Sequence, residues 1–131
     1  MDILKIFKSD KDGTRKSHLK NLVCVAMADG KIDEQEWELL SVIARALGIT
    51  EDEIEKIAHS PENVQFQAPA TYGEKVEQIQ DLVAVMTVDG AISPKELSLC
   101  KKISLKLDIL PQMVDDIIED YYIASRSADL N

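Results

Sequence analysis

Apolar residues recur along most of this chain at the spacing of one helix face. Between residues 14 and 29 they fall at i, i+3, i+4, i+7 and i+8, the rule for a helix that buries one side. Five later segments repeat this period, and none shows the alternation typical of strands. The pattern predicts six helices, at about residues 14–29, 34–47, 51–59, 71–88, 94–107 and 111–124. We therefore expect an all-α fold, a helical bundle of about six main helices.

The same period predicts which side chains are buried and which segments are irregular. The inward residues are Leu19, Leu22, Val23, Ala26 and Met27 in the first helix, and Val114, Ile117, Ile118 and Tyr121 in the last. Residues 1–13 form a basic and apolar segment that ends in a predicted loop at residues 10–13. Residues 60–70 are the predicted connection between two halves, with room for a short helical turn, and residues 125–131 are a predicted flexible tail.

The second half of the chain repeats the first. Residues 19–59, set against residues 79–119 at a constant offset of 60, share 12 identities over 41 positions, nearly all at predicted core or turn positions. A duplicated three-helix unit, at about residues 14–60 and 71–124, is the simplest explanation. Each unit alone is too small to bury its apolar faces, so we expect two pseudo-symmetric repeats that share one core in a single domain, residues 14–124.

Both halves contain the pattern D-G-x-I-x-x-x-E, at residues 29–36 and 89–96, where one helix should end and the next begin. Gly30 and Gly90 supply the left-handed backbone that commonly follows a helix C-terminus. In each copy a residue that caps helices precedes a glutamate by three positions, which is the spacing of a capping box, and an isoleucine before the cap has hydrophobic-staple spacing. These structural residues are Ile32, Asp33 and Glu36 in the first turn, stapled to Trp37, and Ile92, Ser93 and Glu96 in the second, stapled to Leu97.

The turns also supply candidate metal ligands. Glycine, isoleucine and glutamate match positions six, eight and twelve of a calcium-binding EF-hand loop. The positions that should carry the first acidic ligands hold Val25 and Met27 in one copy and Val85 and Thr87 in the other, so a complete EF-hand is excluded. If the halves pack about a two-fold axis, the carboxylates of both turns can approach one another. The candidate ligands for calcium or magnesium are Asp29, Asp33, Glu36, Asp89 and Glu96. The alternative is that these groups only cap helices and face solvent.

Composition and charge exclude some classes of function. The net charge of −9 argues against nucleic-acid binding, because phosphate contacts need a surplus of lysine and arginine, and it suits a cation or a basic partner. Cys24 and Cys100 lie in helical patterns outside any C-x-x-C motif, so we expect small buried thiols in a reducing compartment. His18 and His59 have no metal-ligand spacing to a partner. No segment is apolar enough to span a membrane and no signal peptide is visible, so we expect a cytoplasmic protein.

Several of these features resemble those of a known family. The sequence V-x-M-A-D-G-K-I-D-E-Q-E-W at residues 25–37, the aliphatic helix after it and the second turn at residues 89–96 are similar to the tellurite-resistance protein TerB family, over roughly residues 14–124. The resemblance implies an all-helical domain with internal pseudo-symmetry, in a cytoplasmic bacterial protein linked to tellurite and related stress responses. It implies no enzymatic activity, and related domains occur fused to membrane co-chaperones. The second copy departs from the first at Thr87-Val88, where the first has Met27-Ala28.

Three functions are compatible with these features. The first is a non-catalytic interaction module for a protein partner, with an acidic surface that binds a divalent cation. The second is a scaffold that docks on a membrane protein through residues 1–11 and one acidic face, with no metal role. The third is an acid–base enzyme, which we do not expect, because the sequence lacks a nucleophile elbow, a phosphate-binding glycine loop and a paired histidine and cysteine.

Overall fold

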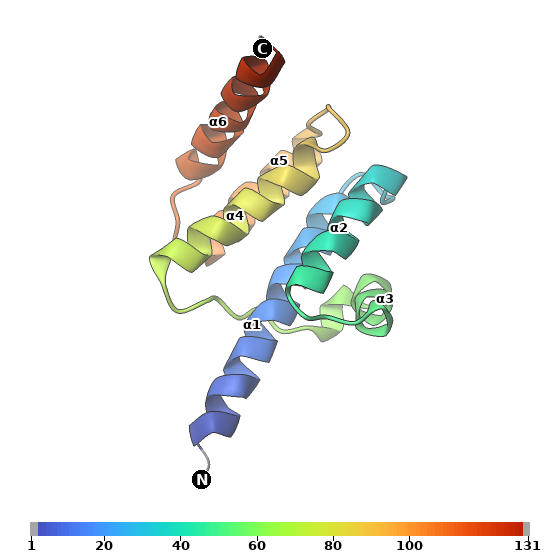
Figure 1. Ribbon diagram of the computed structural model, residues 1–131, viewed down its shortest axis with the longest axis vertical. Coiled ribbons are helices and arrows are strands. Elements are labelled where there is room, and N and C mark those ends of the chain that lie inside the picture. Colours follow the sequence, from blue (N-terminus) through green and yellow to red (C-terminus); the bar gives the residue numbers. More distant parts are fainter. Residues whose placement is uncertain (1–2, 130–131) are drawn as a thin grey trace.

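A computed structural model describes the backbone of residues 3–129 and the side chains of residues 11–125. Within this part of the chain the fold is all-α, as predicted (Figure 1). The elements are α1 (Ile3–Ala26), α2 (Glu34–Ala46), α3 (Glu51–His59), the short 3₁₀ helix η1 (Pro61–Asn63), α4 (Tyr72–Thr87), α5 (Pro94–Lys106) and α6 (Gln112–Asp129). The short helical turn predicted in the connection is therefore η1.

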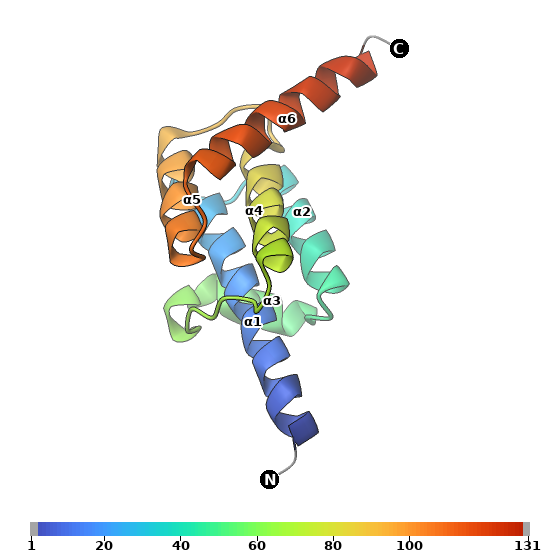
Figure 2. The same ribbon diagram turned by 90° about the vertical axis from the view of Figure 1, so that its left-hand side faces the viewer.

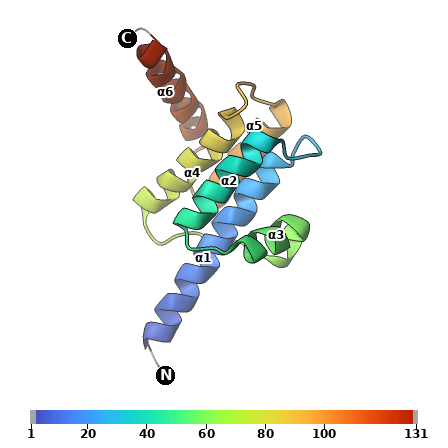
Figure 3. The ribbon, with the colours of Figure 1, turned by 45° about the vertical axis from the view of Figure 1, so that its right-hand side comes forward.

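The main helices pack as two related triplets. Helix α1 contacts α2 and α3, and α4 makes the equivalent contacts with α5 and α6. Between the triplets, α1 lies against α4. Helix α1 also contacts α5, and the equivalent helix α4 contacts α2. Helices α2 and α5 do not contact each other. Exchanging the triplets leaves this set of contacts unchanged, which is the property of a pseudo-two-fold axis between α1 and α4 (Figures 1 and 3). Because α1 and α4 run in the same direction, the turns that follow them lie at the same end of the bundle.

Local geometry repeats as well. Helix α5 begins and ends 60 residues after α2. Gly30 and Gly90 both have positive φ, 108° and 84°, as the turn pattern predicted. After α2 and α5 the chain again uses the left-handed region, with φ 76° at Gly48 and 61° at Asp108. In each repeat the next amide then hydrogen-bonds back to the carbonyl five residues earlier, at 2.9 Å and 3.0 Å. The two repeats thus share the backbone conformation where their first and second helices end. Identical aliphatic core residues alone would not require this similarity.

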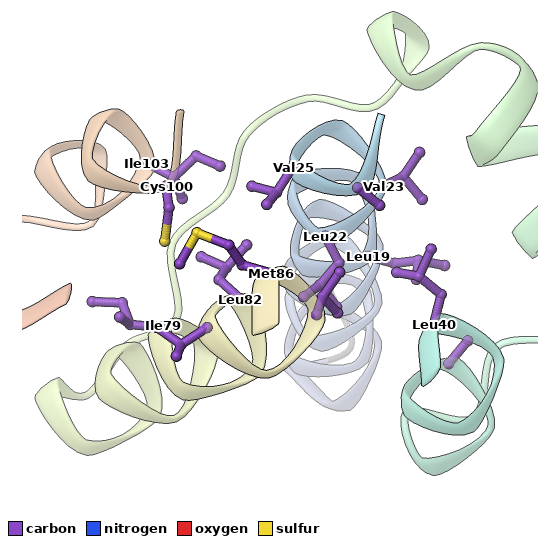
Figure 4. Packing of buried hydrophobic residues seen from close by; sticks show 14 of the residues in the cluster. Leu19, Leu22, Val23, Val25, Leu40, Ile79, Leu82, Met86, Cys100 and Ile103 are labelled. Carbon is purple, nitrogen blue, oxygen red and sulfur yellow. The ribbon is translucent and has the colours of Figure 1, made fainter. Parts of the chain in front are cut away.

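One hydrophobic core lies between the triplets. Leu19, Leu22 and Leu82 of the α1–α4 contact are fully buried, and Met86 joins them (Figure 4). Leu40 covers this contact from α2, and Cys100 with Ile103 covers it from α5. Burial of leucine-sized side chains contributes roughly 1.5–3 kcal/mol each, so this shared layer is what holds the repeats together.

The predicted loop at residues 10–13 and the predicted helix start at Thr14 are wrong, because α1 is continuous from Ile3. Gly13 lies inside the helix, where a Cβ atom would meet Oε1 of Gln67 at 2.2 Å. The connection between the halves lies against this segment, and the Gln67 amide donates a hydrogen bond of 2.8 Å to Oγ of Ser17. Glycine at residue 13 therefore marks a close approach between segments. The predicted roles of the first residues concern side chains at residues 1–10, which lie outside the described side chains.

Three further expectations fail at helix ends. Helix α1 stops at Ala26, so Met27 begins the turn and is 40% exposed instead of buried. Helix α6 continues to Asp129, which replaces most of the predicted flexible tail. Its buried side is limited to the first turns: Val114 is fully buried and Ile118 half-buried, but Tyr121 is 44% exposed. The periodicity of α6 identified the correct face, but that face extends beyond the helices that cover it (Figure 2).

Candidate functional site

The first turn places two carboxylates at the start of α2. Asp33 has extended backbone and caps the helix, accepting a hydrogen bond of 2.8 Å from the amide of Glu36. The Glu36 carboxylate accepts in return from the Asp33 amide at 3.3 Å. This is the predicted capping box. It holds the glutamate side chain back over the turn, where it is only 5% exposed.

The second turn repeats the cap but not the whole box. Oγ of Ser93 accepts from the amides of Lys95 and Glu96, at 3.2 Å and 3.4 Å. The Glu96 side chain, which is 2% exposed, shares a hydrogen bond with the Asp29 carboxylate of the other turn. The predicted second capping box is therefore replaced by a contact between the repeats.

The two turns meet through these side chains. The Ser93 hydroxyl donates a hydrogen bond to Oδ1 of Asp29, 64 residues earlier in the chain. Oxygen atoms of Asp33, Glu36 and Asp89 lie within 4.8 Å of one another. All five predicted ligands thus come together at one end of the bundle, and we call Asp29, Asp33, Glu36, Asp89 and Glu96 the acidic cluster. The predicted structural residues Ile32 and Ile92 pack against the core below it.

Two members of the acidic cluster are carboxylates inside the protein. Oε2 of Glu36 and Oε2 of Glu96 are buried and have no hydrogen-bond partner within the described part of the chain. Burial raises the pKa of Glu36 to about 7, and the nearby carboxylates of Asp33 and Asp89 favour its neutral form further. Burial raises the pKa of Glu96 to about 8, supported by its hydrogen bond with Asp29 and by the charge of Glu36. At neutral pH the metal-free cluster therefore retains protons.

Asp29 behaves in the opposite way. It lies on the surface, and its pKa is lowered first by the hydrogen bond from Ser93 and then by the one from Glu96. Opposite pKa shifts in hydrogen-bonded carboxyls indicate that protonated Glu96 donates to ionised Asp29. The cluster thus contains both exposed anionic oxygens and buried oxygens that lack a positive partner.

This set of donors fits a hard divalent cation. Calcium and magnesium bind carboxylate oxygens, complete their coordination with water, and favour the ionised form of the acids. Asp33, Glu36 and Asp89 offer three oxygens close enough for one ion, with Glu96 and Asp29 next to them. Thr87 does not belong to this set, because its hydroxyl donates to the carbonyl of Val83 at 2.8 Å.

Comparison with known proteins agrees with this architecture. Residues 2–59 match the family model of tellurite resistance protein TerB. The match covers the first repeat and its acidic turn, so this part of the chain is similar to the TerB family. The second repeat is related to the first through the internal duplication. A search of curated proteins and a search of solved structures each found no match.

The sequence did not predict one polar contact made by a buried histidine. His18 of α1 is 3% exposed, and its Nε2 lies 2.8 Å from Oδ2 of Asp81 in α4. The pair borders a cavity of about 190 Å³ that is also lined by Arg15, Glu74 and Glu77. No spacing rule connects residues 18 and 81, so only the α1–α4 contact reveals the pair.

The two cysteines have low chemical reactivity. Cys100 is fully buried and burial raises the pKa of its thiol to about 12, while Cys24 is half-buried with a raised pKa from the same cause. These thiols are poor nucleophiles at neutral pH. Among residues 3–129, no helix has the length and apolar character needed to cross a bilayer.

Proposed function

We propose that this TerB-like domain acts by binding and without catalysis, and that its acidic cluster holds a calcium or magnesium ion. The observation that carries the proposal is the convergence of Asp33, Glu36 and Asp89 from both repeats, with ligand atoms within 4.8 Å of one another. The buried, unpartnered oxygens of Glu36 and Glu96 support it, because a hydrogen-bonding network satisfied within the protein would leave neither of them without a partner.

The chemistry of the site favours a cation over the anion associated with the family name. Tellurite is negatively charged and would be repelled by the ionised carboxylates of the acidic cluster. A divalent cation stabilises their ionised form and replaces the repulsion between the turns with shared coordination. We infer that a TerB-like domain of this kind contributes to a stress response through a cation-dependent surface that recognises a protein partner.

A cation bound in the acidic cluster would connect the two repeats. Asp33 and Glu36 belong to the first turn and Asp89 to the second, so one ion fixes the relative position of both turns. The starts of α2 and α5, which follow the two turns, lie at this end of the bundle (Figure 3). A partner that contacts both turns would then bind the loaded form better than the metal-free form.

Calorimetric titration with calcium and with magnesium tests the cation site, together with thermal unfolding in the presence and absence of each metal. Wild-type protein should release or absorb heat and unfold at a higher temperature with metal. The double variant Asp33→Asn and Asp89→Asn should lose both responses, whereas Asp52→Asn, an exposed carboxylate on α3, is the matched control and should retain them. Absence of heat and of a thermal shift at millimolar metal with wild-type protein would reject the cation site.

A further inference from the structure

The C-terminal half of α6 stands away from the bundle. Every residue from Glu119 to Ser125 is exposed, so no side of this helix segment is covered. It nevertheless carries large apolar side chains: Tyr121 is 44%, Tyr122 37% and Ile123 50% exposed. Figures 1 and 2 show the same feature, with the last turns of α6 extending beyond α4 and α5. Isolated helical turns are unstable in water, so a second surface is expected to cover them.

The apolar stripe of α6 is continuous across this boundary. It begins at Val114, which is fully buried against the core, and passes through Ile117 and Ile118, which are half-buried. At the next turn it reaches Tyr121, which is exposed. A stripe at i, i+3, i+4 and i+7 that is half covered within one chain has the form of an incomplete helix–helix contact.

Charge indicates the kind of helix that would complete the contact. Residues 112–125 contain four acidic residues, Asp115, Asp116, Glu119 and Asp120, and no lysine or arginine. At the start of α1 the sequence of residues 3–11 contains three lysines, one aspartate and four apolar residues, Ile3, Leu4, Ile6 and Phe7. The first segment is acidic and apolar, and the second is basic and apolar, so they are complementary.

These segments cannot meet within one copy. The start of α1 and the end of α6 lie at opposite ends of the long axis of the molecule (Figures 1–3). Residues 3–11 span about 14 Å of helix and the exposed residues 119–125 span about 11 Å, so the two segments are of similar length. Two copies placed side by side in opposite directions bring each α1 start to the other copy's α6 end and close the contact with two-fold symmetry.

We propose that this face of α6 is a self-association surface, and that its occupant is the basic, apolar start of α1 from a second copy of the chain. The proposal is independent of cation binding. Because both segments combine charged with apolar residues, we expect the association to be weak, reversible and sensitive to salt.

Charge reversal on each side tests the pairing. One variant carries Lys5→Glu and Lys8→Glu, and the other carries Glu119→Lys and Asp120→Lys, each in the full chain. Sedimentation and light scattering up to about 0.5 mM protein, in the presence of a chelator, measure the molecular mass, a range that detects weak association. Wild-type protein should dimerise with increasing concentration, and each variant alone should stay monomeric, because like charges then face each other.

The decisive sample is an equimolar mixture of the two variants. In the mixture each acidic segment again faces a basic one, so dimers should re-form at about the wild-type concentration. The matched control for the α6 variant, Asp52→Lys and Glu55→Lys on the exposed face of α3, makes the same change in charge as that variant and should associate like wild type. Circular dichroism checks that all variants keep the helical fold.

Each other result overturns the proposal. A wild-type protein that is monomeric throughout the range shows that a different partner covers α6. A wild-type dimer that persists in both reversal variants uses another surface. Loss of association in each variant without recovery in the mixture shows that the segments of α1 and α6 do not face each other.

Discussion

Replacement of Glu96 by glutamine should stabilise the metal-free protein at alkaline pH, although it removes a native charge. Folding raises the pKa of this glutamate from 4.5 to about 8. A carboxyl whose folded pKa is raised stabilises the fold when protonated, and this contribution is lost as the pH rises from 4.5 through about 8. Glutamine stays neutral throughout and can still donate to Asp29, so the variant does not lose this contribution.

The magnitude follows from linkage. One pKa unit corresponds to about 1.4 kcal/mol, so the full shift of Glu96 corresponds to at most about 5 kcal/mol; relaxation of the turns on ionisation should reduce the effect to about 2–3 kcal/mol. Urea unfolding of wild type and Glu96→Gln at intervals between pH 5 and 8.5, with a chelator present, measures it. The two proteins should be nearly equal in stability at about pH 5 and should diverge as the pH rises, with the variant more stable.

The test uses the difference in free energy of unfolding between the two proteins at each pH. The profile of one protein alone is not enough, because other groups also titrate in this range. Glu55→Gln on α3 changes an exposed carboxylate in the same way and is the matched control for the substitution itself. A Glu96→Gln variant that follows the wild-type profile, or that is less stable at pH 8, would refute the reasoning that burial opposes ionisation at this position. Saturating calcium should remove most of the alkaline loss in wild type, because the cation favours the ionised acids.

Substitutions at three other positions test separate parts of the structure by urea unfolding. Ser93→Ala should destabilise the protein by about 1–2 kcal/mol, because it removes both the helix cap and the hydrogen bond to Asp29; a loss no larger than that of a surface alanine would contradict both roles. Asp108→Gly should stabilise it by up to about 1 kcal/mol, because φ there is 61°, and a destabilisation would show that the aspartate side chain has an unrecognised role. Asp81→Ala should cost about 1–3 kcal/mol by leaving the buried ring of His18 without its partner, while Asp81→Asn should recover part of this, and equal losses in both would contradict a hydrogen-bonding role.

Local rules predicted the helix starts well. Asp33 and Ser93 cap the helices that the turn pattern indicated, and Thr50 and Thr71 cap α3 and α4 in the same way. Capping depends on residues three positions apart, so no tertiary information is needed. The loop expected near Gly13 failed for the opposite reason. Its glycine and aspartates are typical of loops, but the segment is helical and lies against a connection more than 50 residues later.

The sequence predicted which residues form the acidic cluster but not how their side chains are arranged. The repeated pattern identified four of the carboxylates, and the fifth, Asp33, was identified as the helix cap of the first turn. Which oxygens converge depends on the pseudo-two-fold axis, and this is a property of the α1–α4 contact. The hydrogen bonds that Asp29 shares with Ser93 and Glu96 join residues more than 60 positions apart, so no local rule could have shown that Glu96 leaves its capping box. His18 and Asp81 escaped prediction for the same reason.

Duplication explains why this protein contains an unfavourable arrangement of charge. A single helix pair needs its N-terminal carboxylates, because they cap the helix and complement its dipole. When the unit is doubled about a two-fold axis, these groups meet carboxylates of the other turn, and the arrangement that stabilises each turn locally produces repulsion between the turns. Protonation of Glu36 and Glu96 relieves that repulsion, and so does a divalent cation. A conflict between local and global stability is expected where a site serves function, and in this fold it is confined to the end of the bundle where the two turns meet.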